Sequence, residues 1–431
     1  MRKGIEGTVN KNLGGDMKKM KTKIAILVGI TVCAILLTSP ALASAGYSKI
    51  YGNANEDEVL DMRDVTYIKL VIFGKKPATT FADANYDGKI SMLDIGQTKL
   101  IILGKEKQLT LVDMADRIVT VPRPVEKIVS TFPEETRVIV EVGGVDKLVG
   151  VSSYLIGDRY APNFIMLIAY PQVKELPGVG SYREPNLEQI VTLNPDVVIS
   201  GNSGPDKANI IQEKTGIPTV ALSAKFDYKG EGGAFEAYRL AGKIIGNEER
   251  AGELISFIND EFDKIRDVTS EIPDSEKIKA YFCSGITRPY CTYDPIEIAG
   301  GINVAAGSGF GWGTQTTKEQ VIKWNPDIIL IHSTSKAHHG FGTIEDILSD
   351  PDLQSINAVK NKRVYYSKGG YVGGNPATAV TEVPYMAKLF YPEKFEDLDV
   401  DEEGNRILEM FYGVDGLYTY MQENCDLYRW E

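Results

Sequence analysis

The chain has 431 residues, of which 43% are hydrophobic and 25% charged, and its formal net charge is −12. This length exceeds that of one average domain, so we expect two or three compact units. Because nucleic acids are bound through basic patches, the acidic balance argues against nucleic acid as a partner.

A targeting segment is predicted at the N-terminus. The basic stretch MKKMKTK precedes an uncharged apolar run, and the small residues SPALASA follow. This order is typical of a cleaved signal peptide, with cleavage after Ala43 or Ala45. The apolar run is shorter than the roughly 20 residues that span a bilayer, which argues against an uncleaved anchor helix. We therefore assign residues 1–45 to the signal, with the true start at Met17 or Met20, and predict an exported protein.

A repeat with a period of 30 residues follows. NANEDEVLDMRD (residues 53–64) aligns with DANYDGKISMLD (residues 83–94), and each copy leads into an amphipathic helical pattern that ends in Gly-Lys. Oxygen-bearing side chains alternate through both loops, and such spacing is typical of loops that wrap Ca²⁺. Gly88 stands at the sharp turn of the second loop, where the first loop has Glu58, so we expect the first site to be weaker. The alternative is a pair of Asx-rich turns that bind no metal.

The predicted calcium ligands are oxygen donors at matching positions of the two loops. They are Asn53, Asn55, Asp57, Val59 (through its carbonyl), Asp61 and Asp64 in the first loop, and Asp83, Asn85, Asp87, Lys89, Ser91 and Asp94 in the second. The duplicated segment, residues 46–108, resembles a type I dockerin, whose loop–helix units bind two Ca²⁺ and dock onto cohesin domains. The resemblance implies a small all-α, EF-hand-like module, a cohesin-domain partner and attachment to the cell surface.

A second repeat organises the rest of the chain. LEQIVTLNPDVVI begins at Leu187 and KEQVIKWNPDIIL at Lys318, and in each copy Asn-Pro-Asp ends a helical pattern before a bare apolar run. Such short runs without alternation are typical of parallel strands that are covered on both faces. Further strands are predicted at KIVST, LVGVS, TVALS, KIKAYFC and RVYYS, and further helices at EETRVIVEVGG and KANIIQEKTG.

These patterns predict an α/β architecture of two lobes, each with a parallel sheet. The lobes are expected at residues 117–230 and 273–431, the second including a C-terminal segment. Between them, within residues 231–272, a charged amphipathic stretch predicts one long helix with at most a break near Gly246.

This architecture resembles the extracytoplasmic solute-binding proteins that serve ABC importers of iron–siderophore complexes, haem and cobalamin (class III periplasmic binding proteins). The segments ADRIVTVPRPVEKIVST, GVGSYREPNLEQIVTLNPDVVISG, YPEKFEDLDV and FYGVD carry the resemblance. It implies two Rossmann-like lobes with a ligand cleft between them, no catalysis, and delivery of a metal chelate to a permease. A ferric complex is the expected ligand, with cobalamin or haem as alternatives. A secreted dockerin-bearing glycan-active enzyme and a surface scaffold protein are the alternatives from other classes.

The resemblance also implies functional residues. Glu188 and Glu319 match glutamates that meet permease arginines in vitamin-B12-binding relatives, although a glutamate at a helix N-terminus also simply stabilises the helix. The residues expected to contact the ligand are Tyr182, Arg183, Arg288, Tyr290, Tyr293, Trp312, His332 and Tyr371.

Histidines and cysteines leave two questions open. All three histidines, His332, His338 and His339, follow the second repeated strand, where they either ligate haem or a metal or belong to an ordinary solvated loop. The first lobe has no histidine, which favours a preformed chelate over a bare ion. Cys283 and Cys291 either pair across a short loop or remain separate thiols.

Overall fold

The computed structural model describes residues 46–157, 161, 164–181, 183–201, 205–223, 227–228, 233–310, 314–332, 343–367 and 375–424. The chain divides into two compact units, Met1–Ser44 and Ala45–Glu431, and the second unit is described here. The predicted signal segment lies outside the described residues. Among the described residues, no helix combines the length and the apolarity that crossing a membrane requires.

A small helical module carries the 30-residue repeat. Helices α2 (Met62–Ile72) and α3 (Met92–Ile102) pack on each other, with the short 3₁₀ helix η1 (Thr80–Ala82) between them in sequence. Each helix begins with a capping box, which pairs Asp61 with Asp64 in α2 and Ser91 with Asp94 in α3. Reciprocal capping satisfies backbone donors that the first turn leaves without partners. The repeat in sequence is therefore a repeat in structure.

The module is held to an antiparallel hairpin. Strands β1 (Gln108–Val112) and β2 (Ile118–Pro122) pair with each other, and the segment before the first loop pairs with β1 through a bridge between Ile50 and Leu111. The backbone N–H of Tyr51 also donates to the carbonyl of Thr110 at 3.0 Å. The chain thus enters and leaves the module beside the same strand.

Each lobe contains a four-stranded parallel sheet. The first is built from β3 (Ile128–Ser130), β4 (Leu148–Val151), β5 (Val197–Ser200) and β6 (Thr219–Ala221), in the order β4-β3-β5-β6. The second is built from β7 (Lys279–Cys283), β8 (Ile302–Asn303), β9 (Ile328–Ile331) and β10 (Val364–Tyr366), in the order β10-β9-β7-β8. In both, the first strand lies between the second and the third. The predicted pair of parallel α/β lobes is confirmed, and the two have the same strand order.

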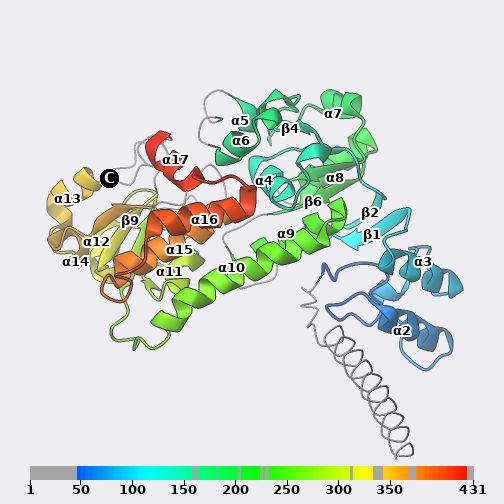
Figure 1. Cartoon of the computed structure of the whole chain (residues 1–431), viewed down its shortest axis with the longest axis horizontal. Coiled ribbons are helices and arrows are strands. Elements are labelled where there is room, and N and C mark those ends of the chain that lie inside the picture. The colour runs from blue at the N-terminus through cyan, green and yellow to red at the C-terminus, as the bar shows by residue number, and fades with distance from the viewer. Residues whose placement is uncertain are drawn as a thin grey trace, which may run out of the picture. The chain divides into compact units, whose positions relative to one another are not determined.

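Helices accompany both sheets (Figure 1). Those of the first lobe are α4 (Pro133–Glu141), α5 (Ser153–Ile156), α6 (Ile165–Ala169), α7 (Leu187–Leu193) and α8 (Pro205–Thr215), with the 3₁₀ helices η2 (Val145–Lys147) and η4 (Pro171–Glu175). Those of the second are α11 (Asp294–Ile298), α12 (Lys318–Trp324), α13 (Ile344–Ser349), α14 (Asn357–Lys360), α15 (Pro376–Phe390), α16 (Val400–Tyr412) and α17 (Leu417–Asn424), with η6 (Pro351–Leu353).

The connection between the lobes is two consecutive helices, and the break between them falls at Gly246, where the sequence pattern allowed for one. Helix α9 (Ala234–Ile245) ends at Gly246, whose φ of 84° places it in the left-handed region, and α10 (Glu248–Thr269) follows directly. Glycine adopts this conformation at little cost, so it is a common helix terminator. The Asn247 side chain then caps α10 by accepting from the Arg250 N–H.

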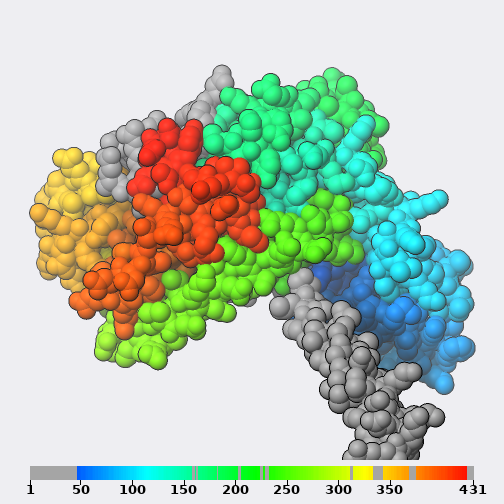
Figure 2. All heavy atoms as spheres, viewed as in Figure 1, coloured from blue at the N-terminus to red at the C-terminus, as the bar shows by residue number. Residues whose placement is uncertain are grey.

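The apolar core is continuous from one lobe to the other. It includes Ile128 and Val197 of the first sheet, Phe282 and Leu330 of the second, and Phe262 of α10. In Figure 2, the green surface of α9 and α10 runs beneath the teal first lobe and the orange helix α16. The lobes therefore share packing along these helices.

Candidate functional site

Three of the predicted ligand-binding residues lie together at the carboxyl ends of the neighbouring strands β7 and β9. The ring of Phe282 lies 4.8 Å from that of Tyr290 and 4.2 Å from that of Tyr293, measured between centroids. The His332 ring, just after β9, stacks on Tyr290 at 5.6 Å with an interplanar angle of 23°. Ligands of parallel α/β sheets bind at this end of the strands, so the cluster stands where a ligand is expected.

The members of this cluster differ in burial. Tyr293 is buried, and its hydroxyl donates to a Glu382 carboxylate oxygen at 3.4 Å. Burial, with the nearby Glu382 carboxylate, raises the pKa of Tyr293 well above its usual value, so the hydroxyl stays neutral. His332 is also buried, whereas Tyr290 is half-buried. Tyr290 is therefore the ring of this group that is most accessible to a solute.

Arg288 lies on the turn that follows β7. Its side chain is half-buried, and its backbone is fixed by a bond from the Arg288 N–H to the Gly285 carbonyl and by one from the Ser284 N–H to the Arg288 carbonyl. The same turn leads to Tyr290, whose N–H donates to the Phe282 carbonyl at 2.9 Å. An arginine two residues before a stacked aromatic ring, on the same turn, is a candidate partner for an anionic, partly flat ligand.

The two cysteines of this lobe do not form a disulfide. Cys283 is buried at the end of β7, and burial raises the pKa of its thiol to about 12. The sulfur of Cys291 lies 3.2 Å from the Ser308 hydroxyl oxygen. The question left open by the sequence is thus answered in favour of separate thiols.

Other predicted ligand residues are less well placed or cannot be located. Arg183 is exposed in the loop before α7, and its carbonyl accepts a hydrogen bond from the Lys207 ammonium. The residues that lie outside the described part of the chain are Tyr182, Trp312, His338, His339 and Tyr371.

A group of buried charges in the first lobe was not predicted from the sequence. Glu134, Glu135 and Arg137 occupy the first turns of α4, directly after β3, and are 5%, 0% and 1% exposed. The Arg137 guanidinium stands over the Phe164 ring at 4.8 Å. Gly201, just beyond β5, leaves room for this group, because a Cβ there would come within 2.2 Å of a Glu135 carboxylate oxygen. The run PEETR immediately after a predicted strand was the signal that could have revealed these residues.

The two predicted docking glutamates occupy equivalent, exposed positions. Glu188 and Glu319 each stand in the first turn of a seven-residue helix, α7 or α12. Hydrogen bonds from the backbone N–H of Glu319 and from the Thr317 side chain hold the pKa of the Glu319 carboxyl below its usual value. Both side chains are therefore exposed at the same point of the repeated helix.

The two oxygen-rich loops share one hydrogen-bond pattern. In the first, the Asp64 carboxylate accepts from the N–H groups of Asn55 at 3.1 Å and Asp61 at 2.8 Å. In the second, the Asp94 carboxylate accepts in the same way from Asn85 at 3.2 Å and Ser91 at 2.6 Å. Both aspartates are fully buried. Burial is the largest cause of a raised pKa at Asp64, so a cation nearby would stabilise its charged form.

The donor set of these loops fits a hard cation. Carboxylate, amide, hydroxyl and carbonyl oxygens are the ligands that Ca²⁺ takes, and Asn53 Oδ1 is buried with no hydrogen-bond partner among the described residues. Across those same residues, no three histidine, cysteine, aspartate or glutamate side chains converge as metal ligands. When bound, Ca²⁺ would neutralise the loop carboxylates and fix the loops, and the predicted ligands named above would hold it.

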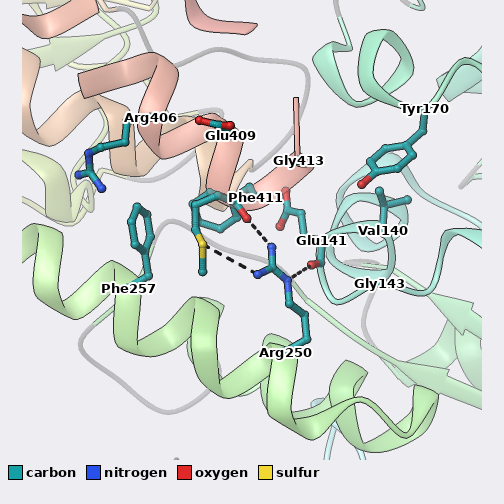
Figure 3. Close-up of a pocket in the computed structure, with 11 residues that line it drawn as sticks. Val140, Glu141, Gly143, Tyr170, Arg250, Phe257, Arg406, Glu409, Phe411 and Gly413 are labelled. Carbon is teal, nitrogen blue, oxygen red and sulfur yellow. Dashed lines mark hydrogen bonds between the residues drawn. The ribbon is translucent and has the colours of Figure 1, made fainter. Parts of the chain in front are cut away.

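A pocket of about 580 Å³ opens elsewhere, between α4, α10 and α16 (Figure 3). Arg250 of α10 crosses it and donates to the backbone carbonyls of Met410 and Glu141. Arg406 pairs with Glu403 and Glu261. The predicted ligand residues do not line this pocket, and its arginines already hold chain groups, so we do not assign the ligand to it.

Two parallel α/β lobes of equal strand order, linked by consecutive helices and with polar and aromatic side chains at their strand ends, define the class of two-lobed binding proteins. The family model described as "Periplasmic binding protein" matches residues 128–370, which agrees with this class. The chain belongs to this family.

The individual relatives have low sequence identity to this chain. The molybdate-binding protein MolA of Haemophilus influenzae is 26% identical over 330 residues, which cover 70% of this chain and 90% of MolA. The uncharacterized ABC transporter substrate-binding lipoprotein YvrC of Bacillus subtilis is 26% identical over 67% of this chain and 87% of YvrC. The vitamin B12-binding protein of Vibrio cholerae is 24% identical over 53% of this chain and 79% of its own length.

The fold comparison agrees with the sequence comparison. The solved structure of MolA bound to molybdate superposes with a TM-score of 0.59 at 22% identity, covering 71% of this chain and 98% of MolA. This likeness establishes the fold. These relatives are binding proteins, and the chain is accordingly a solute-binding protein.

Proposed function

We propose that this chain captures an anionic metal complex outside the cytoplasm and delivers it to the permease of an ABC importer. The observation that carries the proposal is the stack of Tyr290 and His332 at the carboxyl ends of β7 and β9, with Arg288 two residues before Tyr290 on the same turn. The aromatic faces suit the organic part of a chelate, and the guanidinium suits its negative charge. No catalytic step is part of the proposal.

A ferric chelate is the ligand that the sequence resemblance favours. The relationship to a protein named for molybdate binding supports a second candidate, a metal oxyanion. In this proposal both are metal-containing anions, so both would be bound through Arg288 and through donors such as the Tyr290 hydroxyl. Cobalamin and haem are the alternatives with the largest organic surfaces, and they would depend more on the aromatic faces, with the haem propionates as further partners for the arginine.

Titration of the purified protein with a ferric siderophore, molybdate, cobalamin and haem distinguishes these ligands. We expect saturable binding of one anionic complex and about tenfold or greater weakening in Arg288→Ala, as for a lost hydrogen bond to a charged group. Arg266→Ala is the matched control, because Arg266 is an exposed arginine of α10 whose guanidinium pairs with the exposed Asp263 and stands over the Phe262 ring, away from the strand ends. The absence of saturable binding to all four compounds would reject the proposal.

A second candidate function concerns the small module, which we propose to be a calcium-dependent docking module for a cohesin-domain protein at the cell surface. Its two helices expose apolar side chains at positions related by the 30-residue repeat. Met62 and Met92 are 53% and 66% exposed at the starts of the helices, and Phe73 and Leu103 are 72% and 64% exposed directly after their ends. Repeated exposed apolar residues favour an interaction surface over a solvated face.

Calcium removal tests this second function. EDTA should release the protein from the cells that display it, and added Ca²⁺ should restore attachment. Met92→Glu combined with Leu103→Glu should abolish attachment without affecting solute binding. Retention of the protein on EDTA-washed cells would show that its attachment does not depend on Ca²⁺.

A further inference from the structure

An arginine is bound to two predicted calcium ligands of the first loop. Arg63 Nη1 lies 3.1 Å from Asp57 Oδ2, and Arg63 Nε lies 3.0 Å from Asp61 Oδ2. These aspartates stand at positions 5 and 9 of the loop. The Asp61 hydrogen bond is the largest cause that raises the pKa of Arg63, followed by the charges of Asp57 and Asp61. A positive group of the chain thus contacts oxygens that a bound ion would need.

The second loop has no such group. The residue that corresponds to Arg63 is Leu93, whose side chain is 67% exposed. In the described part of the chain, no lysine or arginine side chain forms an ion pair with Asp83, Asp87 or Asp94. The two loops therefore differ in charge although their backbone hydrogen bonds match.

Position 1 also carries less negative charge in the first loop than in the second. The Asn53 amide nitrogen donates to the carbonyls of Asp57 at 2.6 Å and Ser48 at 2.8 Å. Exchanging the amide's oxygen and nitrogen would place an oxygen against two carbonyl oxygens, so the nitrogen belongs there. At the same position of the second loop, the Asp83 carboxylate accepts from the N–H groups of Asp87 at 3.1 Å and Gly88 at 2.8 Å. Position 1 of the first loop is thus a neutral amide, with Oδ1 as its single acceptor atom, where the second loop has a negatively charged carboxylate.

We propose that the Arg63 guanidinium replaces the metal ion in the first loop, so that the module binds one Ca²⁺, in the second loop. The inference rests on the proposed calcium function of the module. Ca²⁺ affinity of such loops rises with the number of charged ligands, and the first loop has lost one charge at Asn53 and has two more paired with Arg63. A Ca²⁺ ion would have to displace the guanidinium from both aspartates.

The repeat offers a matched pair of substitutions. Arg63→Leu gives the first loop the residue of the second, and Leu93→Arg does the reverse. Leucine and arginine have similar helix propensities, so neither exchange should change the stability of α2 or α3 much. The full-length protein, stripped with EDTA, is titrated with CaCl₂ by calorimetry, and circular dichroism checks that each variant is folded.

We expect the wild-type protein to bind one Ca²⁺ per chain and Arg63→Leu to bind two. Leu93→Arg should bind its single ion about tenfold more weakly or worse, because the substitution adds a positive charge to the second loop. Asp87→Asn should also weaken the wild-type site, which assigns that site to the second loop. Two ions of similar affinity in the wild-type protein, with Arg63→Leu unchanged, would overturn the inference and leave the calcium function intact. A lack of Ca²⁺ binding in all variants would instead reject the calcium function itself.

Discussion

The half-buried Arg123 and the buried Glu106 form an ion pair, with 3.1 Å between Arg123 Nε and a Glu106 carboxylate oxygen. Glu106 directly follows α3 and its loop, whereas Arg123 follows β2. The same guanidinium donates to the carbonyls of Lys243 and Ile244 at 2.7 and 2.6 Å, which end α9. One side chain therefore joins the small module, the hairpin and the helix that leaves the first lobe.

Loss of this arginine should loosen the module from the lobe. Arg123→Ala leaves Glu106 buried without its counterion and removes the donors at the end of α9, so we expect a loss of about 3–5 kcal/mol in the free energy of unfolding. Urea unfolding, followed by circular dichroism, measures the effect. Arg266→Ala is the control, because its exposed ion pair should contribute about 0–1 kcal/mol. An Arg123→Ala loss as small as that of the control would contradict this role.

The pH dependence of stability should reflect Glu141, which is buried between α4, α9 and α16. Its carboxylate accepts from the hydroxyls of Tyr238 and Tyr412, each at 2.6 Å. Burial raises its pKa above the ordinary 4.5, and the two hydroxyls only partly oppose this. The folded chain therefore keeps the proton in a pH range where the unfolded chain has lost it. This stabilising contribution is full below about pH 4.5 and is lost as the pH rises through the folded-state pKa.

Glu141→Gln removes this titration. We expect the unfolding free energy of the wild-type protein, minus that of the variant, to fall as the pH is raised from 4.5 to neutrality. Urea unfolding at a series of pH values gives this difference. Glu213→Gln, at an exposed position of α8, should show a flat difference. A Glu141→Gln difference that rises with pH would show that the carboxylate is stabilised in its charged form.

The charges that the sequence analysis missed in the first lobe can be tested through Gly201. A methyl group at this position would lie 2.2 Å from a Glu135 carboxylate oxygen, so Gly201→Ala forces that carboxylate to turn. Because the displaced atoms are the end of a flexible side chain, the stability cost should be about 1–2 kcal/mol.

If Glu135 takes part in the solute site, both Gly201→Ala and Glu135→Gln should weaken solute binding about tenfold. Gly96→Ala, which has open space around the new methyl group, is the control, and unchanged binding in Glu135→Gln would exclude Glu135 from the site.

The sequence was sufficient to predict the lobes because their signals are local. The apolar runs at residues 197–200 and 328–331 became β5 and β9, and the Asn-Pro-Asp motif ended α7 and α12 as expected. Asn194 and Asn325 adopt the left-handed conformation, with φ values of 47° and 45°. Asparagine tolerates that conformation better than most residues. This tolerance explains why the same residue stands at both positions.

The site was predicted only in part because its formation depends on contacts that are distant in sequence. Tyr290 and His332 meet only because β7 and β9 are neighbours, an order that no local pattern specifies. Tyr293 has the same residue type and lies three positions after Tyr290, yet it is buried against Phe282. Whether an aromatic side chain in this segment faces a solute or the core therefore depends on packing that the sequence does not display.

The equivalent exposure of Glu188 and Glu319 leads to a prediction about transport. Each glutamate stands in the first turn of its helix, with a side-chain cap at the preceding Asn186 or Thr317. If the two carboxylates meet basic residues of a permease, reversing their charge should prevent docking while the solute site is unaffected. Surface charges of this kind act mainly on association with a partner. Glu188→Arg with Glu319→Arg should therefore bind solute normally and abolish uptake in cells.

A matched control separates docking from a general effect of charge. Glu345 is also an exposed glutamate in the first turn of a helix, α13, but it has no counterpart in the repeat. Glu345→Arg should keep both solute binding and uptake, because it changes the net charge without touching the proposed docking points. Each single variant, Glu188→Arg or Glu319→Arg, should reduce uptake less than the double variant, since one lobe keeps its contact. Normal uptake in the double variant would leave helix stabilisation as the only role of these two glutamates.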